Sequence, residues 1–279
     1  MKPQNKLESG RPTQPVASTI GQVWLVGAGP GDPELITLRA LKLLQRADVV
    51  VYDRLVAQEL LSHCRPDAML RYVGKKCSEH SVPQDQINAL LVEQARLGRQ
   101  VVRLKGGDPF LFGRGGEEMM ELRAHGVSVS IVPGITAALG CAAATGIPLT
   151  HRDCAAGVSL MTAHRCEGAQ GYDWASLAAD RQRTLAFYMG LAQANHIATE
   201  LMLHGLPRDT PVALVSRGTT SAQRALRCTL GTLAAASRLN GLESPCLIMV
   251  GDVVRLADPT KVIYVVQDAA QQQAMACPA

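Results

Sequence analysis

Aromatic residues are scarce in this chain of 279 residues: three Phe, two Trp and five Tyr make up 4% of it. Proteins that bind single-stranded nucleic acids stack bases on aromatic rings, so this scarcity argues against such a role. The net charge of +4 is also small for a nucleic-acid-binding surface. We therefore expect no nucleic-acid partner.

Long hydrophobic runs are absent as well. The longest apolar stretches, such as residues 211–216 and 246–251, are far shorter than the ~20 residues of a transmembrane helix. Residues 1–20 are polar and lack the apolar core of a secretory signal. The eight cysteines include no C-x-x-C pair. We expect no membrane partner, and a cytoplasmic protein with reduced thiols.

Several catalytic signatures are missing too. The seven histidines form neither H-x-H nor H-E-x-x-H, so we expect no metal site. No G-x-S-x-G elbow marks a hydrolase, and no Lys-containing P-loop marks a nucleotide phosphatase.

What the sequence does contain is a regular alternation of short β-rich runs and runs of helical period. This alternation predicts mainly parallel sheets covered on both faces. The expected strands comprise residues 23–27, 48–52, 69–73, 101–105 and 127–132, and then 157–162, 184–189, 212–216, 247–250 and 262–266. Apolar stripes of helical spacing lie between them, at Leu35, Leu38, Leu41 and Leu44 and at Ile87, Leu90, Leu91 and Ala95.

The pattern is interrupted at Pro133-Gly134, after which residues 135–147 are small and apolar and predict a closely packed helix or a hinge. We therefore expect two α/β domains, at residues 21–134 and 135–268. Each is built on a roughly five-stranded, mainly parallel or mixed sheet with flanking helices. The active-site cleft lies between them. Residues 1–20 are expected to form a flexible extension and residues 269–279 a flexible tail.

A glycine-rich loop, GAGPGDP at residues 27–33, follows the first expected strand. Its context is that of a dinucleotide-binding loop, but Pro30 has no N–H to offer a phosphate. Asp32 is placed to cap the next helix and Pro33 suits its first position, with Glu34 in the first turn. Two carboxylates would occupy the helix end that a pyrophosphate needs. The loop indicates a ligand without phosphates, or a tight turn with no ligand.

Longer motifs give the chain a family resemblance. Residues 27–32 followed by 35–40 (LITLRA), residues 47–55 (ADVVVYDRL), residues 106–118 (GGDPFLFGRGGEE) and residues 132–137 (VPGITA) resemble the tetrapyrrole methylases that use S-adenosylmethionine. The resemblance covers about residues 21–268. Residues 52–55, 74–76 and 112–118 are typical of the branch that methylates uroporphyrinogen III.

The resemblance implies a reaction and its partners. The substrate would be uroporphyrinogen III, methylated at C2 and C7 to give precorrin-2 for sirohaem, cobalamin or haem d1 biosynthesis. S-adenosylmethionine would be the cofactor, S-adenosylhomocysteine its product, and the enzyme a homodimer without a metal. Three alternatives stay open: a sibling methylase acting on a later corrinoid, a nicotinamide oxidoreductase, and a non-catalytic tetrapyrrole carrier.

The same resemblance implies roles for individual residues. The cofactor pocket would be lined by Pro30, Gly106, Gly107, Asp108, Leu111, Thr136, Ala137, Met189, Ala213 and Gly218. Asp53 would accept a proton and Lys75 would donate one. The substrate side would comprise Arg114, Glu117, Arg152 and Met189, because guanidinium groups bind carboxylates through two parallel hydrogen bonds. Arg114 would also assist catalysis, although a guanidinium is a poor base.

Overall fold

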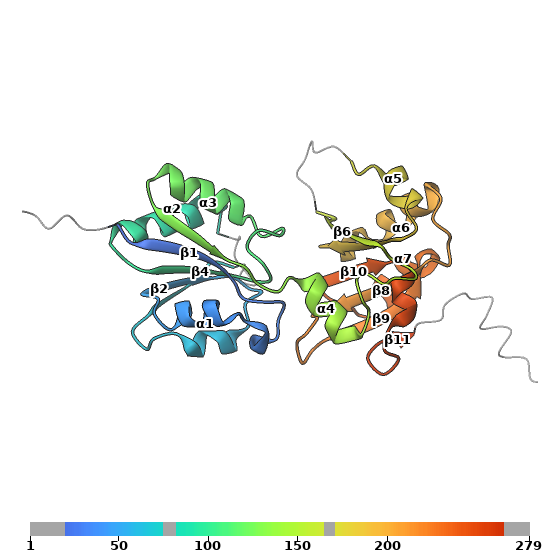
Figure 1. Cartoon of the computed structure of the whole chain (residues 1–279), viewed down its shortest axis with the longest axis horizontal. Coiled ribbons are helices and arrows are strands. Elements are labelled where there is room, and N and C mark those ends of the chain that lie inside the picture. The colour runs from blue at the N-terminus through green and yellow to red at the C-terminus, as the bar shows by residue number, and fades with distance from the viewer. Residues whose placement is uncertain (1–19, 75–81, 165–170, 265–279) are drawn as a thin grey trace, which may run out of the picture.

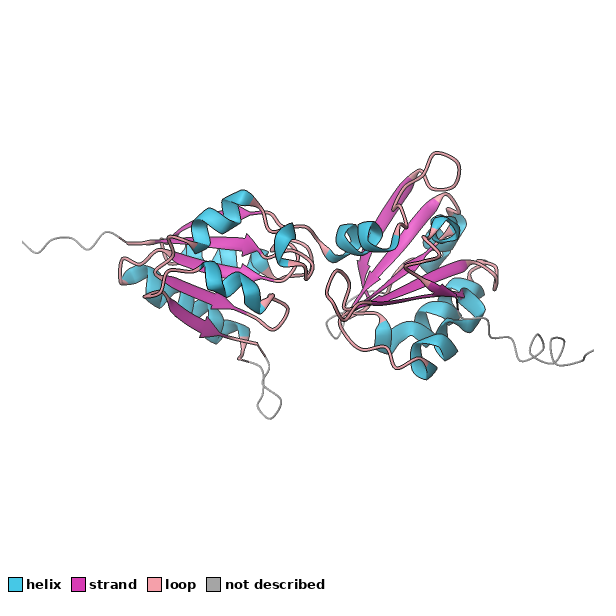
Figure 2. Ribbon diagram, turned by 90° about the horizontal axis from the view of Figure 1, so that it is seen from below, coloured by secondary structure: helices cyan, strands magenta, loops and turns pink. Residues whose placement is uncertain are grey.

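The protein is described by a computed structural model that covers residues 20–74, 82–164 and 171–264. Figures 1 and 2 show two lobes, each with its own β-sheet, and the short helix α4 (Ala137–Thr145) lies where they meet. The expected flexible extension and tail fall outside the described residues, apart from Ile20. Among the helices of these three ranges, none is long and apolar enough to cross a membrane.

The first lobe contains a parallel five-stranded sheet in the order β3-β2-β4-β1-β5. Its strands are β1 (Gln22–Gly27), β2 (Val49–Tyr52), β3 (Met69–Tyr72), β4 (Val101–Lys105) and β5 (Ser128–Val132). Its helices are α1 (Leu38–Leu44), α2 (Gln84–Arg96) and α3 (Gly115–Ala124), with the short 3-10 segments η1 (Pro33–Leu35) and η2 (Gln58–His63).

Both faces of this sheet are covered because the strand side chains alternate. Val23, Leu25 and Val101 pack under α2 and α3, whereas Val26 and Val102 pack under α1 and η2. The inner strands are consequently apolar on both sides. Since the strands are parallel, their carboxyl ends lie at one edge, and the loops after β1 and β4 leave from that edge toward the second lobe (Figure 1).

The second lobe contains a mixed six-stranded sheet in the order β11-β9-β8-β10-β7-β6. Its strands are β6 (Gly157–Thr162), β7 (Arg183–Tyr188), β8 (Pro211–Ser216), β9 (Arg224–Thr229), β10 (Cys246–Val250) and β11 (Ile263–Tyr264). Its helical segments are α5 (Trp174–Ala179), η3 (Leu191–Gln193), α6 (Ala194–Leu203), η4 (Leu230–Thr232), α7 (Leu233–Leu239) and η5 (Asp252–Leu256). Strand β10 runs antiparallel to both β7 and β8.

Two cores flank this second sheet. Large side chains such as Phe187 and Leu214 pack under α6 and α7. On the other face Ala186 and Ala213 pack under α4, where their small size lets the helix approach the sheet closely. Alanines on β7 and β8 therefore mark the place where the helix at the junction packs on this sheet.

The predicted fold class, two α/β domains on sheets of roughly five strands, is confirmed. The second sheet has one strand more than expected, because residues 224–229 form β9. The segment 135–147 is a helix, as the first of its two interpretations held. The bounds 21–134 and 135–268 stay a prediction, and β5 ends just before the proposed boundary, at Val132.

The glycine loop is followed by a 3-10 segment, where the sequence predicted the start of a helix. Asp32 accepts a hydrogen bond from the N–H of Glu34 (2.9 Å) and Pro33 occupies the first position, as predicted. The element they cap is the 3-10 segment η1, and the α-helix begins only at Leu38 with Thr37 as its cap. Leu38, expected on a buried stripe, is 76% exposed as a result.

Candidate functional site

The loops after β1 and β4 are joined through their backbones. The N–H of Gly107 donates to the carbonyl of Gly29 (2.7 Å), and the N–H of Gly29 donates to the carbonyl of Gly107 (3.3 Å). A Cβ at Gly27 would stand 2.5 Å from Cα of Gly134 and 2.6 Å from the carbonyl oxygen of Gly107. Only glycine permits this approach of three backbone segments. The motifs that carried the family resemblance therefore meet in space.

Asp108 ties this assembly to the segment between the lobes. Its Oδ1 accepts from the N–H of Phe110 (2.8 Å), and its Oδ2 accepts from the N–H of Gly134 (3.0 Å). Gly107 beside it has φ +68°, and a Cβ there would have its nearest neighbour at 3.9 Å, Cα of Thr136. A side chain at Gly107 would therefore point toward the start of α4 and would meet it at ordinary van der Waals distance.

The second lobe reaches this point through Tyr188 at the end of β7. Its hydroxyl accepts from the N–H of Ala138 (3.0 Å) and shares a hydrogen bond with the hydroxyl of Thr136 (2.7 Å). Its ring lies 4.9 Å from the ring of Phe112 in the loop after β4. Burial raises the pKa of Tyr188, so the hydroxyl keeps its proton. Tyr188 thereby contacts both the first lobe and the N-terminus of α4.

A second set of contacts between the lobes surrounds the glycine loop. The N–H of Asp32 donates to Oγ1 of Thr219 (3.0 Å), which follows β8. A Cβ at Gly31 would lie 2.7 Å from the Thr220 side chain. A Cβ at Gly140 would lie 2.5 Å from Pro30. The loop after β1 is therefore clamped between α4 and the loop after β8.

Backbone strain is concentrated at this junction. In the described part of the chain, positive φ values at non-glycine residues occur at Phe112, Arg114, Met189, Arg217 and Thr219, from 48° to 67°. Each such residue costs ~1–3 kcal/mol and persists only where its surroundings enforce it. Two of them lie in the segment between β4 and α3, and the other three closely follow β7 or β8. Strained residues gather at functional sites, so this distribution supports a site here.

Arg114 and Glu117 form an exposed, two-pronged ion pair at the start of α3. Nε of Arg114 donates to Oε1 of Glu117 (3.0 Å) and Nη2 donates to Oε2 (2.5 Å). The hydrogen bond from Arg114 lowers the pKa of Glu117, which stays ionised. Arg114 itself is left-handed and caps α3 between two glycines. Glu117 thus holds the Nε and Nη2 edge of an exposed guanidinium group.

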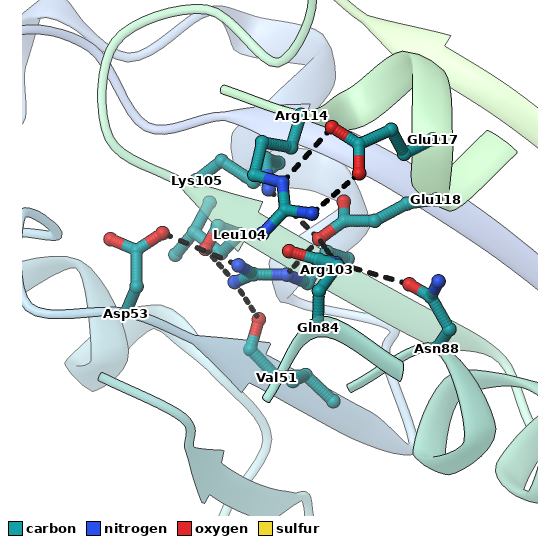
Figure 3. Close-up of polar contacts among 10 residues, drawn as sticks. All are labelled: Val51, Asp53, Gln84, Asn88, Arg103, Leu104, Lys105, Arg114, Glu117 and Glu118. Carbon is teal, nitrogen blue, oxygen red and sulfur yellow. Dashed lines mark hydrogen bonds and ion pairs between the residues drawn. The ribbon is translucent and has the colours of Figure 1, made fainter. Parts of the chain in front are cut away.

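Beneath this pair lies a buried group of charges that the sequence did not predict (Figure 3). Glu118 is fully buried, and its Oε1 accepts from Nε of Arg103 (3.1 Å), Nζ of Lys105 (2.9 Å) and Nε2 of Gln84 (3.2 Å). Arg103 extends further to Oδ2 of Asp53 (3.4 Å). Burial, and after it the charge of Arg103, lowers the pKa of Lys105.

The predicted site residues fall into several groups. The structure brings together, around the junction, Pro30, Gly106, Gly107, Asp108, Thr136, Ala137, Met189 and Gly218. Leu111 is half-buried in the loop after β4, and Asp53 lies with the buried charges. Ala213 is fully buried under α4 rather than at a surface. Arg152 is exposed in a turn at residues 151–155 and is not among the residues gathered at the junction. Lys75 lies outside the described residues.

Four residues of this region escaped the sequence reasoning: Arg103, Lys105, Glu118 and Tyr188. A signal for the first two was present, because charged residues on a central strand are rare unless they are paired. Arg103 and Lys105 alternate with Leu104 and so share the face of Val101, the face under α3. Their partner Glu118 could not be identified in this way, because only the fold shows that its helix, α3, covers this face. Nothing in the sequence singles out Tyr188.

Two surface hollows lie away from the junction. One, of about 210 Å³, is lined by residues of α5, β7 and η5, and another, of about 400 Å³, is lined by α2 and α3. Neither contains a predicted site residue. Within residues 20–74, 82–164 and 171–264, no group of three or more His, Cys, Asp or Glu side chains is arranged to hold a metal ion. The candidate site therefore rests on the contacts at the junction.

Comparison with known proteins places these motifs in one family. Residues 22–234 match the family described as Tetrapyrrole (Corrin/Porphyrin) Methylases. A siroheme synthase of Stutzerimonas stutzeri is 56% identical over 239 residues, which are 86% of this chain and 51% of that protein. Siroheme synthase 1 of Aeromonas hydrophila is 60% identical over 238 residues, 85% of this chain and 51% of that protein. The chain thus spans about half the length of these curated relatives.

Two solved structures are similar over nearly their whole length. Uroporphyrin-III C-methyl transferase from Thermus thermophilus, complexed with S-adenyl homocysteine, is 42% identical with a TM-score of 0.72, covering 85% of this chain and all of that one. A cobalt precorrin-4 methyltransferase is 32% identical with a TM-score of 0.76, covering 87% of this chain and 99% of that one. Both likenesses extend across the two lobes and the junction between them.

Proposed function

This chain belongs to the tetrapyrrole (corrin/porphyrin) methylases, and from that premise we propose that it methylates uroporphyrinogen III at C2 and C7 to give precorrin-2. S-adenosylmethionine is the methyl donor, and each transfer releases one S-adenosylhomocysteine. The observation that carries the choice of substrate is the 42% identity to a uroporphyrin-III C-methyl transferase over the full length of that chain.

The geometry at the junction fits the methyl donor. Because Gly107 has no side chain, the space between it and Thr136 is left to a ligand. Asp108 and the hydroxyl of Thr136 supply acceptors beside that space. Pro30 and Gly218 lie against α4 at Gly140 and Cys141. When bound there, S-adenosylmethionine supplies a methyl group on a sulfonium, ready for in-line attack. The residues of this chain orient that group and exclude water from it.

The residues outside the cofactor pocket act on the macrocycle. The Arg114 fork binds propionate or acetate side chains of the substrate, which carries eight carboxylates. Glu117 holds that fork in position through both of its oxygens. As a ring carbon gains the methyl group, the macrocycle must lose a proton, and Asp53 is the nearby carboxylate assigned to accept it. Lys75 stays a predicted proton donor, and Arg152 stays a predicted contact of the substrate.

A sibling reaction is the second candidate. The likeness to a cobalt precorrin-4 methyltransferase has the higher TM-score, 0.76, although its identity is only 32%. A later corrinoid intermediate carries the same carboxylates and would use the same fork. A non-catalytic tetrapyrrole carrier is disfavoured, because a carrier would not need Gly107 and Asp108 brought together with Thr136 and Ala137.

The deciding experiment is anaerobic incubation with uroporphyrinogen III and S-adenosylmethionine, followed by mass measurement of the product. We expect the addition of two methyl groups. No methylated product, together with calorimetric binding of S-adenosylhomocysteine, would move the assignment to the sibling reaction. Absence of both methylation and S-adenosylhomocysteine binding would favour the non-catalytic tetrapyrrole carrier.

Three further expectations belong to this proposal. The curated relatives are siroheme synthases, so we propose that the product enters sirohaem synthesis. The homodimer implied by the resemblance is checked by light scattering of the purified chain. The cytoplasmic location is checked by cell fractionation.

A further inference from the structure

Arg103 is a buried guanidinium that connects two carboxylates. Its side chain is 4% exposed, and all three of its nitrogen atoms have partners. Nε donates to Glu118 (3.1 Å), Nη1 donates to the carbonyls of Val51 (3.3 Å) and Leu104 (3.0 Å), and Nη2 faces Asp53 (3.4 Å). The two carbonyl contacts fix the plane of the guanidinium group, and in that plane Nη2 points toward Asp53.

The charges around Arg103 do not balance without Asp53. Arg103 and Lys105 are both buried, and both donate to the same oxygen of Glu118. One buried carboxylate thus faces two buried cations. Glu118 Oε2 is itself buried and has no hydrogen-bond partner among the described residues, so both cations share Oε1. Buried cations need compensating carboxylates, and Asp53 is the second one at hand.

Asp53 sits where such a counter-ion can also face outward. It follows β2, whose last residue, Tyr52, pairs with Leu104 on β4. Its Oδ1 accepts from the N–H of Leu55 (3.1 Å) while Oδ2 faces Arg103, so both oxygens are held. The side chain is still 27% exposed. A carboxylate that is held by two hydrogen bonds and partly exposed to solvent has a fixed orientation in which it can accept a proton.

We propose that Arg103 is a positioning residue that holds the Asp53 carboxylate for its part in the reaction, with Glu118 and Lys105 fixing Arg103 in turn. This inference rests on the proposed function, in which Asp53 accepts the proton that leaves the macrocycle. Arginine is needed because its fork reaches Glu118 and Asp53 at once. A lysine at this position would satisfy one carboxylate and release the other.

The test is a double-mutant cycle with Arg103→Lys and Asp53→Asn, measured by kcat and by the KM for S-adenosylmethionine. Arg103→Lys alone lowers kcat about tenfold, because a misplaced catalytic group costs at least that much. The KM for S-adenosylmethionine stays within about twofold. In the Asp53→Asn background, Arg103→Lys has little further effect on kcat, since its target is already gone.

The matched control is Arg65→Lys. Arg65 also bridges two carboxylates, those of Asp48 (3.1 Å) and Asp67 (2.7 Å), but away from the site. Its replacement leaves kcat and KM unchanged. Equal losses of kcat from Arg103→Lys in both backgrounds would overturn the proposal, as would a parallel loss of S-adenosylhomocysteine affinity, because either would mark Arg103 as general structural support.

A second measurement needs neither turnover nor a change at Arg103. If Asp53 balances the buried cations, Asp53→Asn lowers the urea midpoint of unfolding, whereas Asp67→Asn, at an exposed partner of Arg65, does not. An unchanged midpoint for Asp53→Asn overturns the proposed charge balance even if Arg103 variants fail to fold. Absence of methylation by the unaltered protein, with the midpoint shift present, would instead refute the proposed function alone.

Discussion

Arg114 combines a strained backbone with a two-pronged side-chain contact that a lysine cannot reproduce. Its backbone is left-handed, with φ 59°, between Gly113 and Gly115. Its guanidinium meets Glu117 through two nitrogen atoms, and 56% of the side chain remains exposed. An exposed ion pair of this kind contributes little to stability, ~0–1 kcal/mol. The strain at Arg114 is therefore better explained by what the fork binds than by what it stabilises.

We expect Arg114→Lys to lose most methylation while retaining S-adenosylhomocysteine binding, because a point charge does not replace a fork. Turnover and calorimetric affinity are measured side by side. Arg255→Lys is the control: Arg255 pairs with Asp252 three residues earlier and is 54% exposed, almost the exposure of Arg114. Normal turnover in Arg114→Lys would remove Arg114 from the substrate site.

At this scale the sequence predicted exposed pairs better than buried ones. Arg114 and Glu117 were both assigned to the substrate side, and the structure joins them by two hydrogen bonds. Arg103, Lys105 and Glu118 were not predicted, because their contact depends on which face of β4 lies under α3. That choice is made by sheet order and register, which a single sequence does not state.

Among the elements, α4 packs closely at the junction, because its residues are mostly small. A Cβ at Gly218 would stand 2.3 Å from Sγ of Cys141 on this helix. We expect Gly218→Ala to lower the melting temperature through this overlap. Removing the sulfur with Cys141→Ala should restore part of the loss, because Cβ of Cys141 is 3.7 Å away.

Scanning calorimetry of the two single variants and the double variant measures this coupling. Cys141→Ala alone costs a small amount for the cavity that it leaves. A double variant as unstable as the sum of the single ones would show that the loop after β8 does not press on α4.

The loop after β4 gives a second prediction, for Gly107→Val. Its side chain would point toward Thr136 in the proposed cofactor pocket, so we expect S-adenosylhomocysteine binding to be abolished. The protein should stay folded, because no atom lies within 3.9 Å of the Cβ position. Gly126→Val is the control, since Gly126 has nearly the same φ, +71° against +68°, and nothing lies within 4 Å of its Cβ position. Both variants carry the strain of a left-handed valine.

Calorimetric affinity and circular dichroism are measured for both glycine variants. Only Gly107→Val should lose affinity. Normal affinity in that variant would place the cofactor elsewhere, and equal losses in both would attribute the effect to strain.

Elements with a strong apolar pattern were predicted closely, and those without one were not. Residues 101–105 and 157–162 are strands with the expected bounds. Strand β9, RALRCT, has two arginines and a single β-branched residue, so its sequence gave little strand signal. The antiparallel course of β10 was also open, because alternation alone does not fix strand direction.

For the whole molecule, Tyr188 is a residue of the second lobe that contacts both the first lobe and the start of α4. Its hydroxyl serves both Thr136 and Ala138, and its ring contacts Phe112. Tyr172 offers a comparison within one lobe: its hydroxyl accepts from the N–H of Thr162 (3.2 Å) and donates to the carbonyl of the same residue (2.7 Å). Each hydroxyl thus makes two hydrogen bonds, but only that of Tyr188 joins β7 to α4.

We expect Tyr188→Phe to weaken S-adenosylhomocysteine binding about tenfold, because the start of α4 loses its partner and an unpaired polar group costs ~1–3 kcal/mol. Tyr172→Phe should reduce stability without a change in affinity. Titration calorimetry gives the affinities and urea unfolding gives the stabilities. Equal affinity in both variants would show that Tyr188 serves only the packing of its own lobe.

The division of strands between the sheets bears on how this protein is made. All strands of the first sheet lie before residue 133 and all strands of the second lie after residue 156. The first lobe can therefore fold on the ribosome while the second is still being synthesised. Tyr188 and Thr219 are translated much later, and without them the loops after β1 and β4 lack their contacts from the second lobe. A nascent chain thus acquires a folded lobe well before it acquires a site, and it cannot begin chemistry until both halves have emerged.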